Sequence, residues 1–376
     1  MPESLFVVTN RHFKRDRKRD SYVLEDGLNR NGAKELRLFE ARPASDALED
    51  WHLDLIPDKP GAQDFQNADV EPIGTRKKRR GSDLVAARVV RRLRESRQNL
   101  LLFIHGYNNT AVDAFRRAWR IAGHYALEVV VFTWPANGGG ERLLEDLHGK
   151  ASYKSDKSDA RASTEALDRA LFRMQALLKE LSEGVKPQAL EEAREAHPGD
   201  PDQQRETLVR LLRERACPFN VSLLAHSMGN YLYKKTLMTS SERLSVDTAF
   251  DNVILKAADA NHEGHKEWVR RIRARRRVYI TVNQNDAALQ LSTMKVGEDQ
   301  KPRLGNTLAE QNAANARYID FTPYVDDRHS YFDETDLGRE EGGAQPLTDF
   351  FKAALNGEIA EWELPYHAGT NTYRIE

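Results

Sequence analysis

Short apolar runs recur along the chain and predict buried β-strands. In residues 99–104, positions 100–104 are all apolar. Such runs are typical of parallel strands that are covered on both faces. We expect further strands at residues 5–9, 21–24, 127–133, 221–224, 250–257, 277–282 and 316–321. Residues 35–40 and 51–56 alternate apolar and polar side chains, which also predicts strands.

Segments with apolar residues at three- and four-residue steps separate these strands and predict helices. Residues 166–181 show this spacing over the longest stretch, and residues 81–97, 228–240 and 347–355 over shorter ones. Thr110 and Asp113 form a capping-box-like pair that predicts the start of another helix. This succession implies an α/β fold with a mostly parallel sheet and helices on both faces. Right-handed crossovers would bring the carboxyl ends of its strands to one edge.

The same patterns divide the chain into two parts. Residues 1–98 contain N-terminal strands, loops and the first helix, with a charged loop at 11–20, and we expect them to pack on the core. Residues 99–376 form the α/β core. Within this core, residues 184–216 are highly charged and are interrupted by His-Pro-Gly-Asp-Pro at 197–201. We therefore expect a charged helical insertion there, in two pieces.

Composition restricts the class of protein further. Among 376 residues, Lys plus Arg number 57 and Asp plus Glu 58, and this balance makes nucleic-acid binding an unlikely main role. We expect the basic run at 76–80 to be solvated surface. A single cysteine, Cys217, and the absence of a signal peptide or an apolar membrane span predict a cytoplasmic protein. No metal-ligand cluster stands out, no cofactor is indicated, and the sequence sets no oligomeric state.

One serine lies where the pattern changes from strand to helix. Residues 220–230 read Asn-Val-Ser-Leu-Leu-Ala-His-Ser-Met-Gly-Asn, and this order predicts a strand, a sharp turn at Ser227 and a helix. Ala225 and Gly229 are small, as the close approach of the two backbones requires. Such a nucleophile elbow usually has Gly at both places, so Ala225 departs from it by one methyl group. The pattern predicts a Ser227 hydroxyl above the carboxyl end of the sheet.

Polar residues after the later strands could complete a catalytic triad. A serine needs a base within hydrogen-bonding reach and a group that orients that base. In the elbow architecture the chain order is Ser, acid, His, which Ser227, Asp286 and His329 satisfy. His329 would accept the Ser227 proton and later protonate the leaving group, while Asp286 would fix the imidazole tautomer. Asp259, after the intervening strand, is the alternative acid.

Several residues compete for these roles. His262, His265 and His367 are rival bases, and we expect the first two to face solvent. A simpler role for either candidate acid, Asp259 or Asp286, is to cap the N-terminus of a helix.

An oxyanion intermediate would need two backbone N–H donors. Met228 follows the nucleophile at a helix start, and Tyr107 lies in the loop after residues 99–104. Gly106 would let that loop turn tightly. We expect His105 and His226 to order these loops without transferring protons.

Four segments together resemble the bacterial α/β-hydrolases of unknown function. They are Phe-Ile-His-Gly-Tyr-Asn at 103–108, Phe-Thr-Trp-Pro at 132–135, Ala-His-Ser-Met-Gly-Asn at 225–230 and His-Ser-Tyr-Phe at 329–332. Arg-Leu-Gly at 303–305 also matches the family. The resemblance covers residues 99–332 and implies an α/β-hydrolase fold with a serine-hydrolase triad. The family's acidic segment after the elbow is matched less closely by Ala-Asp-Ala-Asn at 258–261.

The sequence thus favours a serine hydrolase that cleaves a carboxylic ester of a small-molecule acyl substrate through an acyl-serine intermediate. The alternative is a non-catalytic binding or scaffolding protein with the same fold. A third hypothesis is nucleic-acid binding through the basic stretches at 76–80 and 270–277.

Overall fold

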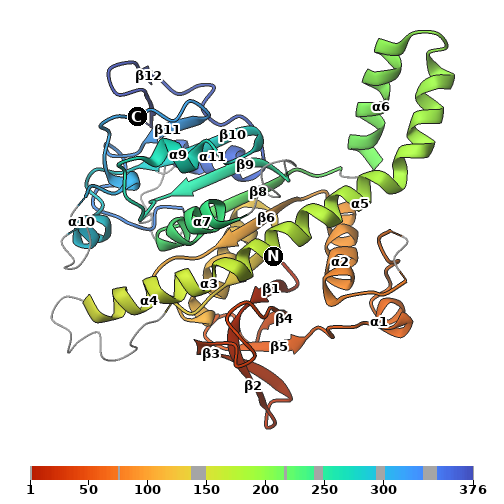
Figure 1. Ribbon diagram of the computed structural model, residues 1–376, viewed down its shortest axis with the longest axis horizontal. Coiled ribbons are helices and arrows are strands. Elements are labelled where there is room, and N and C mark those ends of the chain that lie inside the picture. The colour runs from red at the N-terminus through yellow and green to blue at the C-terminus, as the bar shows by residue number, and fades with distance from the viewer. Residues whose placement is uncertain are drawn as a thin grey trace.

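A single large β-sheet runs through the protein in this computed structural model, which describes residues 2–74, 77–136, 150–215, 218–240, 249–293, 301–332 and 345–375. Its eleven strands have the order β12-β13-β11-β10-β9-β8-β6-β7-β1-β4-β5 (Figure 1). The strands are β1 (Leu5–Thr9), β4 (Arg37–Pro43), β5 (Trp51–Leu55), β6 (Asn99–Ile104), β7 (Leu127–Thr133), β8 (Val221–His226), β9 (Phe250–Lys256), β10 (Ala274–Val282), β11 (Ala316–Asp320), β12 (Tyr366–His367) and β13 (Thr372–Arg374).

The central part of the sheet consists of β1, β7, β6, β8, β9, β10 and β11 in this order, and each of these strands runs parallel to its neighbour, as predicted. Strand β13 runs parallel to β11. Antiparallel pairing within this sheet is confined to its two edges, where β4 pairs with β1 and with β5, and β12 pairs with β13.

Two apolar cores cover the two faces of the sheet. In β6, Leu100, Leu102 and Ile104 belong to one core, whereas Leu101 and Phe103 belong to the other. Successive side chains of a strand point to opposite faces, so a strand buried on both faces carries mostly apolar side chains. This arrangement explains the continuous apolar run in the sequence.

The helices divide between these two cores, which confirms the predicted sheet with helices on both faces. The first core contains α2 (Gly81–Ser96), α4 (Lys150–Ala162), α5 (Thr164–Ala196), α7 (Met228–Thr239) and α9 (His265–Val269). The second contains α3 (Ala111–Tyr125) and α11 (Gln345–Leu355). Two short helices, α1 (Ala62–Asn67) and α10 (Ala287–Thr293), lie in connecting segments. Thr110 and Asp113 form the predicted capping box at the start of α3.

The N-terminal residues extend the same sheet, because β1 pairs with β7 and carries β4 and β5 beyond it. The charged loop predicted at 11–20 is wrong: β2 (Arg11–Asp16) and β3 (Ser21–Leu28) form an antiparallel hairpin. Its charged residues, such as Arg15, stand exposed on the hairpin. Arg11 instead is fully buried and reaches Thr133 and the carbonyl of Asn109. A charged run can therefore form a strand when its side chains reach water or buried partners.

The charged segment at 184–216 is helical in its described part. It forms the last turns of α5 and all of α6 (Pro201–Arg215), which project together from the body (Figure 1). The chain reverses after the C-cap residue His197, where the sequence predicts an interruption. Pro187 lies inside α5 without ending it. Among the described residues, no helix has both the length and the apolar character needed to cross a membrane.

Candidate active site

Ser227 occupies a strained turn between β8 and α7. Its backbone dihedrals are φ 53° and ψ −124°, and few non-glycine residues adopt a positive φ. The Ser227 N–H donates to the carbonyl of Lys256 at 3.0 Å, and the Ser227 carbonyl accepts from the Asp259 N–H at 3.2 Å. Strained residues of this kind cluster at functional sites, where the surrounding structure holds them. The turn is therefore the sharp strand-to-helix junction that the sequence predicts.

Two glycines make the close packing around Ser227 possible. A Cβ at Gly229 would lie 2.6 Å from the carbonyl oxygen of His105, and one at Gly106 would lie 2.6 Å from the Cβ of Ser227. Ala225, which stands where the usual elbow has a glycine, is fully buried, and the turn forms with its methyl group in place. The loop after β6 thus packs directly against Ser227.

The side chain of Asn230 ties the elbow together, a role that the sequence did not reveal. Its Nδ2 donates to the carbonyl oxygens of Ala225 at 2.9 Å and of Ser227 and Lys256 at 3.1 Å each. These contacts join the end of β8, the turn and the end of β9.

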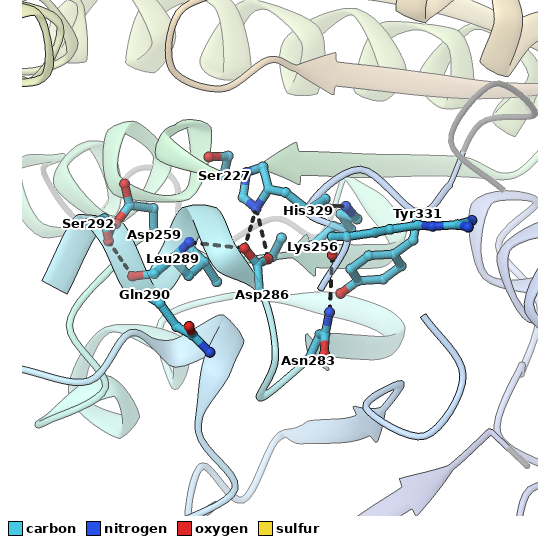
Figure 2. A network of polar contacts seen from close by, with 12 residues as sticks. Ser227, Lys256, Asp259, Asn283, Asp286, Leu289, Gln290, Ser292, His329 and Tyr331 are labelled. Atoms are coloured by element: carbon cyan, nitrogen blue, oxygen red, sulfur yellow. Dashed lines mark hydrogen bonds and ion pairs between the residues drawn. The ribbon is translucent and has the colours of Figure 1, made fainter. Parts of the chain in front are cut away.

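Asp286 and His329 meet at the carboxyl ends of β10 and β11. The Nδ1 of His329 lies 2.8 Å from Oδ2 and 3.0 Å from Oδ1 of Asp286 (Figure 2). Asp286 Oδ1 also accepts from the Leu289 N–H at 2.9 Å, as the N-cap of α10 would. The Asn283 side chain donates to the carbonyls of Asp326 and Arg328, and so holds the loop that carries His329. A carboxylate accepts, so Nδ1 carries the proton and Nε2 is left as the basic nitrogen.

Ser227 and His329 line the same cavity, which has a volume of about 300 Å³. Its other lining residues are Tyr107, Asn108, Asn109, Arg117, Tyr153, His226, Asp259, Ala288, Leu289, Leu291, Ser292 and Ser330. The Ser227 hydroxyl and the His329 ring form no hydrogen bond within the described part of the chain, and Figure 2 draws none between them. Catalytic hydrogen bonds are often long in unliganded enzymes and tighten in the substrate complex.

Asp259, the alternative acid, is bound to other groups. Its carboxylate lies 3.2 Å from Nε of the buried Arg303 and accepts from the Tyr153 and Ser292 hydroxyls at 3.0 Å each. It precedes no described helix in the way that an N-cap would, and it does not contact His329 among the described contacts. Arg303 belongs to the Arg-Leu-Gly segment, whose Gly305 has no room for a Cβ beside the backbone of Ala257 and Ala258.

The rival histidines lie away from Ser227. His262 and His265 are buried, which corrects the expectation that they face solvent. His265 lies 2.6 Å from the Tyr318 hydroxyl, and burial lowers its pKa to about 4. His367 belongs to β12 at the far edge of the sheet (Figure 1). None of the three lines the cavity that contains Ser227.

The two predicted oxyanion donors flank the serine. Met228 is the first residue of α7, where helical N–H groups have no partner within the helix. Tyr107 follows Gly106 in the loop after β6 and lines the cavity. This loop is anchored at both sides, because Asn108 N–H donates to buried Asp156 at 3.1 Å and the Asn109 carbonyl accepts from Arg11 at 2.8 Å.

His105 and His226 are buried and neutral. His105 Nδ1 donates to the Gly106 carbonyl at 3.0 Å, while Nε2 accepts from the Trp134 N–H at 3.2 Å. Burial, reinforced by the charge of Arg11, lowers the pKa of His105 to about 3. Burial and the neighbouring Lys256 likewise hold the pKa of His226 well below its ordinary value. Both imidazoles therefore suit the predicted role of ordering the loops.

No group of three or more His, Cys, Asp or Glu side chains is arranged to hold a metal ion within the described ranges.

Comparison of the sequence with known families finds a match to one family model. A family model described as alpha/beta hydrolase of unknown function (DUF900) matches residues 83–181 and 201–327, which is more than half of the chain. Ser227, Asp286 and Tyr107 fall inside the match, and His329 lies just beyond its end. The unmatched residues 182–200 fall on the projecting helical pair, and β1 to β5 precede the match. Among curated proteins, none matches the sequence significantly.

Proposed function

The chain belongs to the alpha/beta hydrolases of unknown function, and within this family we propose that it is a serine hydrolase that cleaves a carboxylic ester or a related acyl bond. The observation that carries this proposal is the hydrogen-bonded pair of Asp286 and His329 in the loops beside the strained Ser227. A nucleophile, a base and an orienting acid are the groups that acyl transfer to serine requires.

The first half of the proposed reaction forms an acyl-serine. His329 Nε2 accepts the proton of the Ser227 hydroxyl as Oγ attacks the carbonyl carbon of the ester. The carbonyl oxygen becomes an oxyanion, which the N–H groups of Met228 and Tyr107 stabilise. The intermediate then collapses, the bond to the alcohol oxygen breaks, and the imidazolium of His329 protonates this leaving group.

The second half returns the enzyme to its starting state. A water molecule gives a proton to His329 Nε2 and attacks the acyl carbon. Collapse of the second intermediate releases the carboxylic acid and gives the proton back to Ser227 Oγ. Throughout, Asp286 accepts from Nδ1, so it keeps Nε2 directed at the reaction and stabilises the imidazolium.

The cavity supports a small substrate. Its volume of about 300 Å³ is at the lower end of the range of small-molecule sites. Leu289 and Leu291 supply apolar contacts, while Asn108 and Asn109 supply polar ones. Arg303 compensates the charge of Asp259, so this carboxylate adds no uncompensated charge to the wall of the cavity. We therefore expect short acyl chains to be preferred.

The test is labelling by a fluorophosphonate, in which Ser227 Oγ displaces fluoride and forms a phosphonyl-serine. We expect the wild type to be labelled at Ser227 and to hydrolyse 4-nitrophenyl acetate, and the Ser227→Ala variant to do neither. Ser222→Ala is the matched control, since Ser222 lies on β8, the strand that leads to Ser227, and its buried hydroxyl has no hydrogen-bond partner among the described residues. A folded wild type that is neither labelled nor active on an ester panel would favour a non-catalytic binding or scaffolding role.

A further inference from the structure

A lysine is buried directly beneath the proposed triad. Lys256 is the last residue of β9, and none of its surface is exposed. Removing an ammonium group from water is costly unless polar or aromatic partners compensate for the lost hydration. Position 256 could hold an apolar residue, as the three preceding positions of β9 do with Val253, Ile254 and Leu255, so the lysine calls for an explanation.

The ammonium group of Lys256 is held by the segment that carries the proposed base. Its Nζ donates a hydrogen bond to the carbonyl oxygen of His329. It also lies 3.7 Å from the ring centroid of Tyr331 and 4.7 Å from that of Phe332. Aromatic faces attract cations, and this attraction is strongest where water is excluded. Figure 2 shows Lys256 between the His329 backbone and the Tyr331 ring.

The backbone of the same lysine holds the nucleophile. The carbonyl oxygen of Lys256 accepts from the Ser227 N–H at 3.0 Å and from the Asn230 side chain at 3.1 Å. Lys256 thus contacts the serine turn through its main chain and the histidine loop through its side chain. Other tethers of this loop reach residues before the histidine: the Asn283 side chain donates to the carbonyls of Asp326 and Arg328, and the Ala287 N–H donates to the carbonyl of Asp327 at 3.1 Å.

We propose that Lys256 is a positioning residue that sets the place of the His329 imidazole relative to Ser227. This inference rests on the proposed serine-hydrolase function. The ammonium group fixes the His329 backbone, and Asp286 then fixes the rotation of the ring. Small displacements matter here, because a misplacement of about 1 Å can cost roughly 100-fold in rate.

The experiment compares three full-length variants. Lys256→Met keeps an unbranched apolar stem and removes the ammonium group, whereas Lys256→Arg keeps a cation that can donate to the His329 carbonyl. Lys157→Met is the matched control, since Lys157, on α4, is also buried and its Nζ lies 4.6 Å from the ring centroid of Tyr231 on α7. The measurements are kcat and KM for 4-nitrophenyl acetate, thermal unfolding, and hydrogen exchange of the peptide that contains His329.

For Lys256→Met we expect kcat to fall about 100-fold with KM changed less than about threefold, because the geometry of the chemical step is disturbed and the cavity is not. Lys256→Arg should recover part of the loss, and Lys157→Met should retain kcat. Exchange around His329 should be faster in Lys256→Met and unchanged in Lys157→Met. A wild-type kcat in Lys256→Met, or an equal loss of kcat in the control, would overturn the inference.

Hydrogen exchange separates this inference from the proposed function. If the wild type hydrolyses no ester but exchange around His329 rises in Lys256→Met alone, Lys256 still positions the loop and the hydrolase proposal fails. If exchange is the same in all variants, Lys256 does not position the loop, whatever the activity.

Discussion

Asp286 uses one carboxylate for two contacts, accepting from Nδ1 of His329 at 2.8 Å through Oδ2 and from the Leu289 N–H at 2.9 Å through Oδ1. The N-terminus of α10 therefore holds the carboxylate of Asp286, and this carboxylate in turn holds the imidazole of His329. Asp259 makes neither contact and binds Arg303 instead. The two candidate acids, which the sequence left as alternatives, thus have different surroundings and predict different variant behaviour.

Asp286→Asn should lower kcat by about four orders of magnitude, because an amide that donates to Nδ1 would stabilise the wrong tautomer of His329. Stability should change little, since Asn caps a helix about as well as Asp. Ester hydrolysis and thermal unfolding measured on the same preparation test this prediction. Near-normal kcat in the folded variant would remove Asp286 from the proposed triad.

Asp259→Asn should act mainly on stability. Both Asp259 and Arg303 are buried, so the variant leaves the Arg303 guanidinium without its charge partner. Breaking a buried ion pair costs about 3 to 5 kcal/mol of unfolding free energy. We expect a loss of about 3 kcal/mol here, because Asn can still accept a hydrogen bond. Denaturant unfolding would measure it. A stable variant with a larger loss of kcat than Asp286→Asn would assign the acid to Asp259.

Gly106→Ala should impair the reaction by crowding the nucleophile. The added Cβ would lie 2.6 Å from the Cβ of Ser227, so the loop or the serine must move. We expect kcat/KM to fall about 100-fold, as for other small displacements of reacting groups. Gly184→Ala is the control, because its Cβ would meet nothing within 4 Å on α5, and Ala there should add up to about 1 kcal/mol of stability. Full activity in Gly106→Ala would contradict the close packing.

Acid should destabilise the protein partly through His105. Its pKa is lowered to about 3 in the folded chain from 6.5, chiefly by burial. Below pH 6.5, His105 of the unfolded chain binds a proton that His105 of the folded chain does not. The contribution of His105 to the unfolding free energy is therefore fully present above pH 6.5 and is lost as the pH falls toward 3. The contribution is up to about 1.4 kcal/mol per pH unit.

Denaturant unfolding at several pH values between neutrality and pH 4 tests this dependence. His105→Asn cannot take up the proton, so its unfolding free energy should fall less steeply with acid. His265 and His226 also have lowered pKa values, so part of the slope should remain. If the unfolding free energy of the wild type and of the variant falls equally steeply with acid, His105 does not contribute to this pH dependence.

Local patterns along the chain predicted the main elements because those patterns are set by short-range geometry. The apolar run of β6 follows from two buried faces, and the small residues around Ser227 follow from the close approach of strand and helix. Strand β2, in the charged stretch at 11–20, escaped prediction, because Arg11 finds its buried partners about a hundred residues away.

The sequence by itself determined that this protein has an α/β core, a serine at a sharp strand-to-helix turn, and acids and histidines after its later strands. Only the tertiary structure decided which of them meet. Asp259 is closer in sequence to Ser227 than Asp286 is, yet Arg303 binds it, while Asp286 faces His329. The buried contact of Lys256 with the His329 carbonyl was equally invisible. Such pairings depend on the order of strands in the sheet and on the direction of each loop, which bring together residues that no short-range pattern connects.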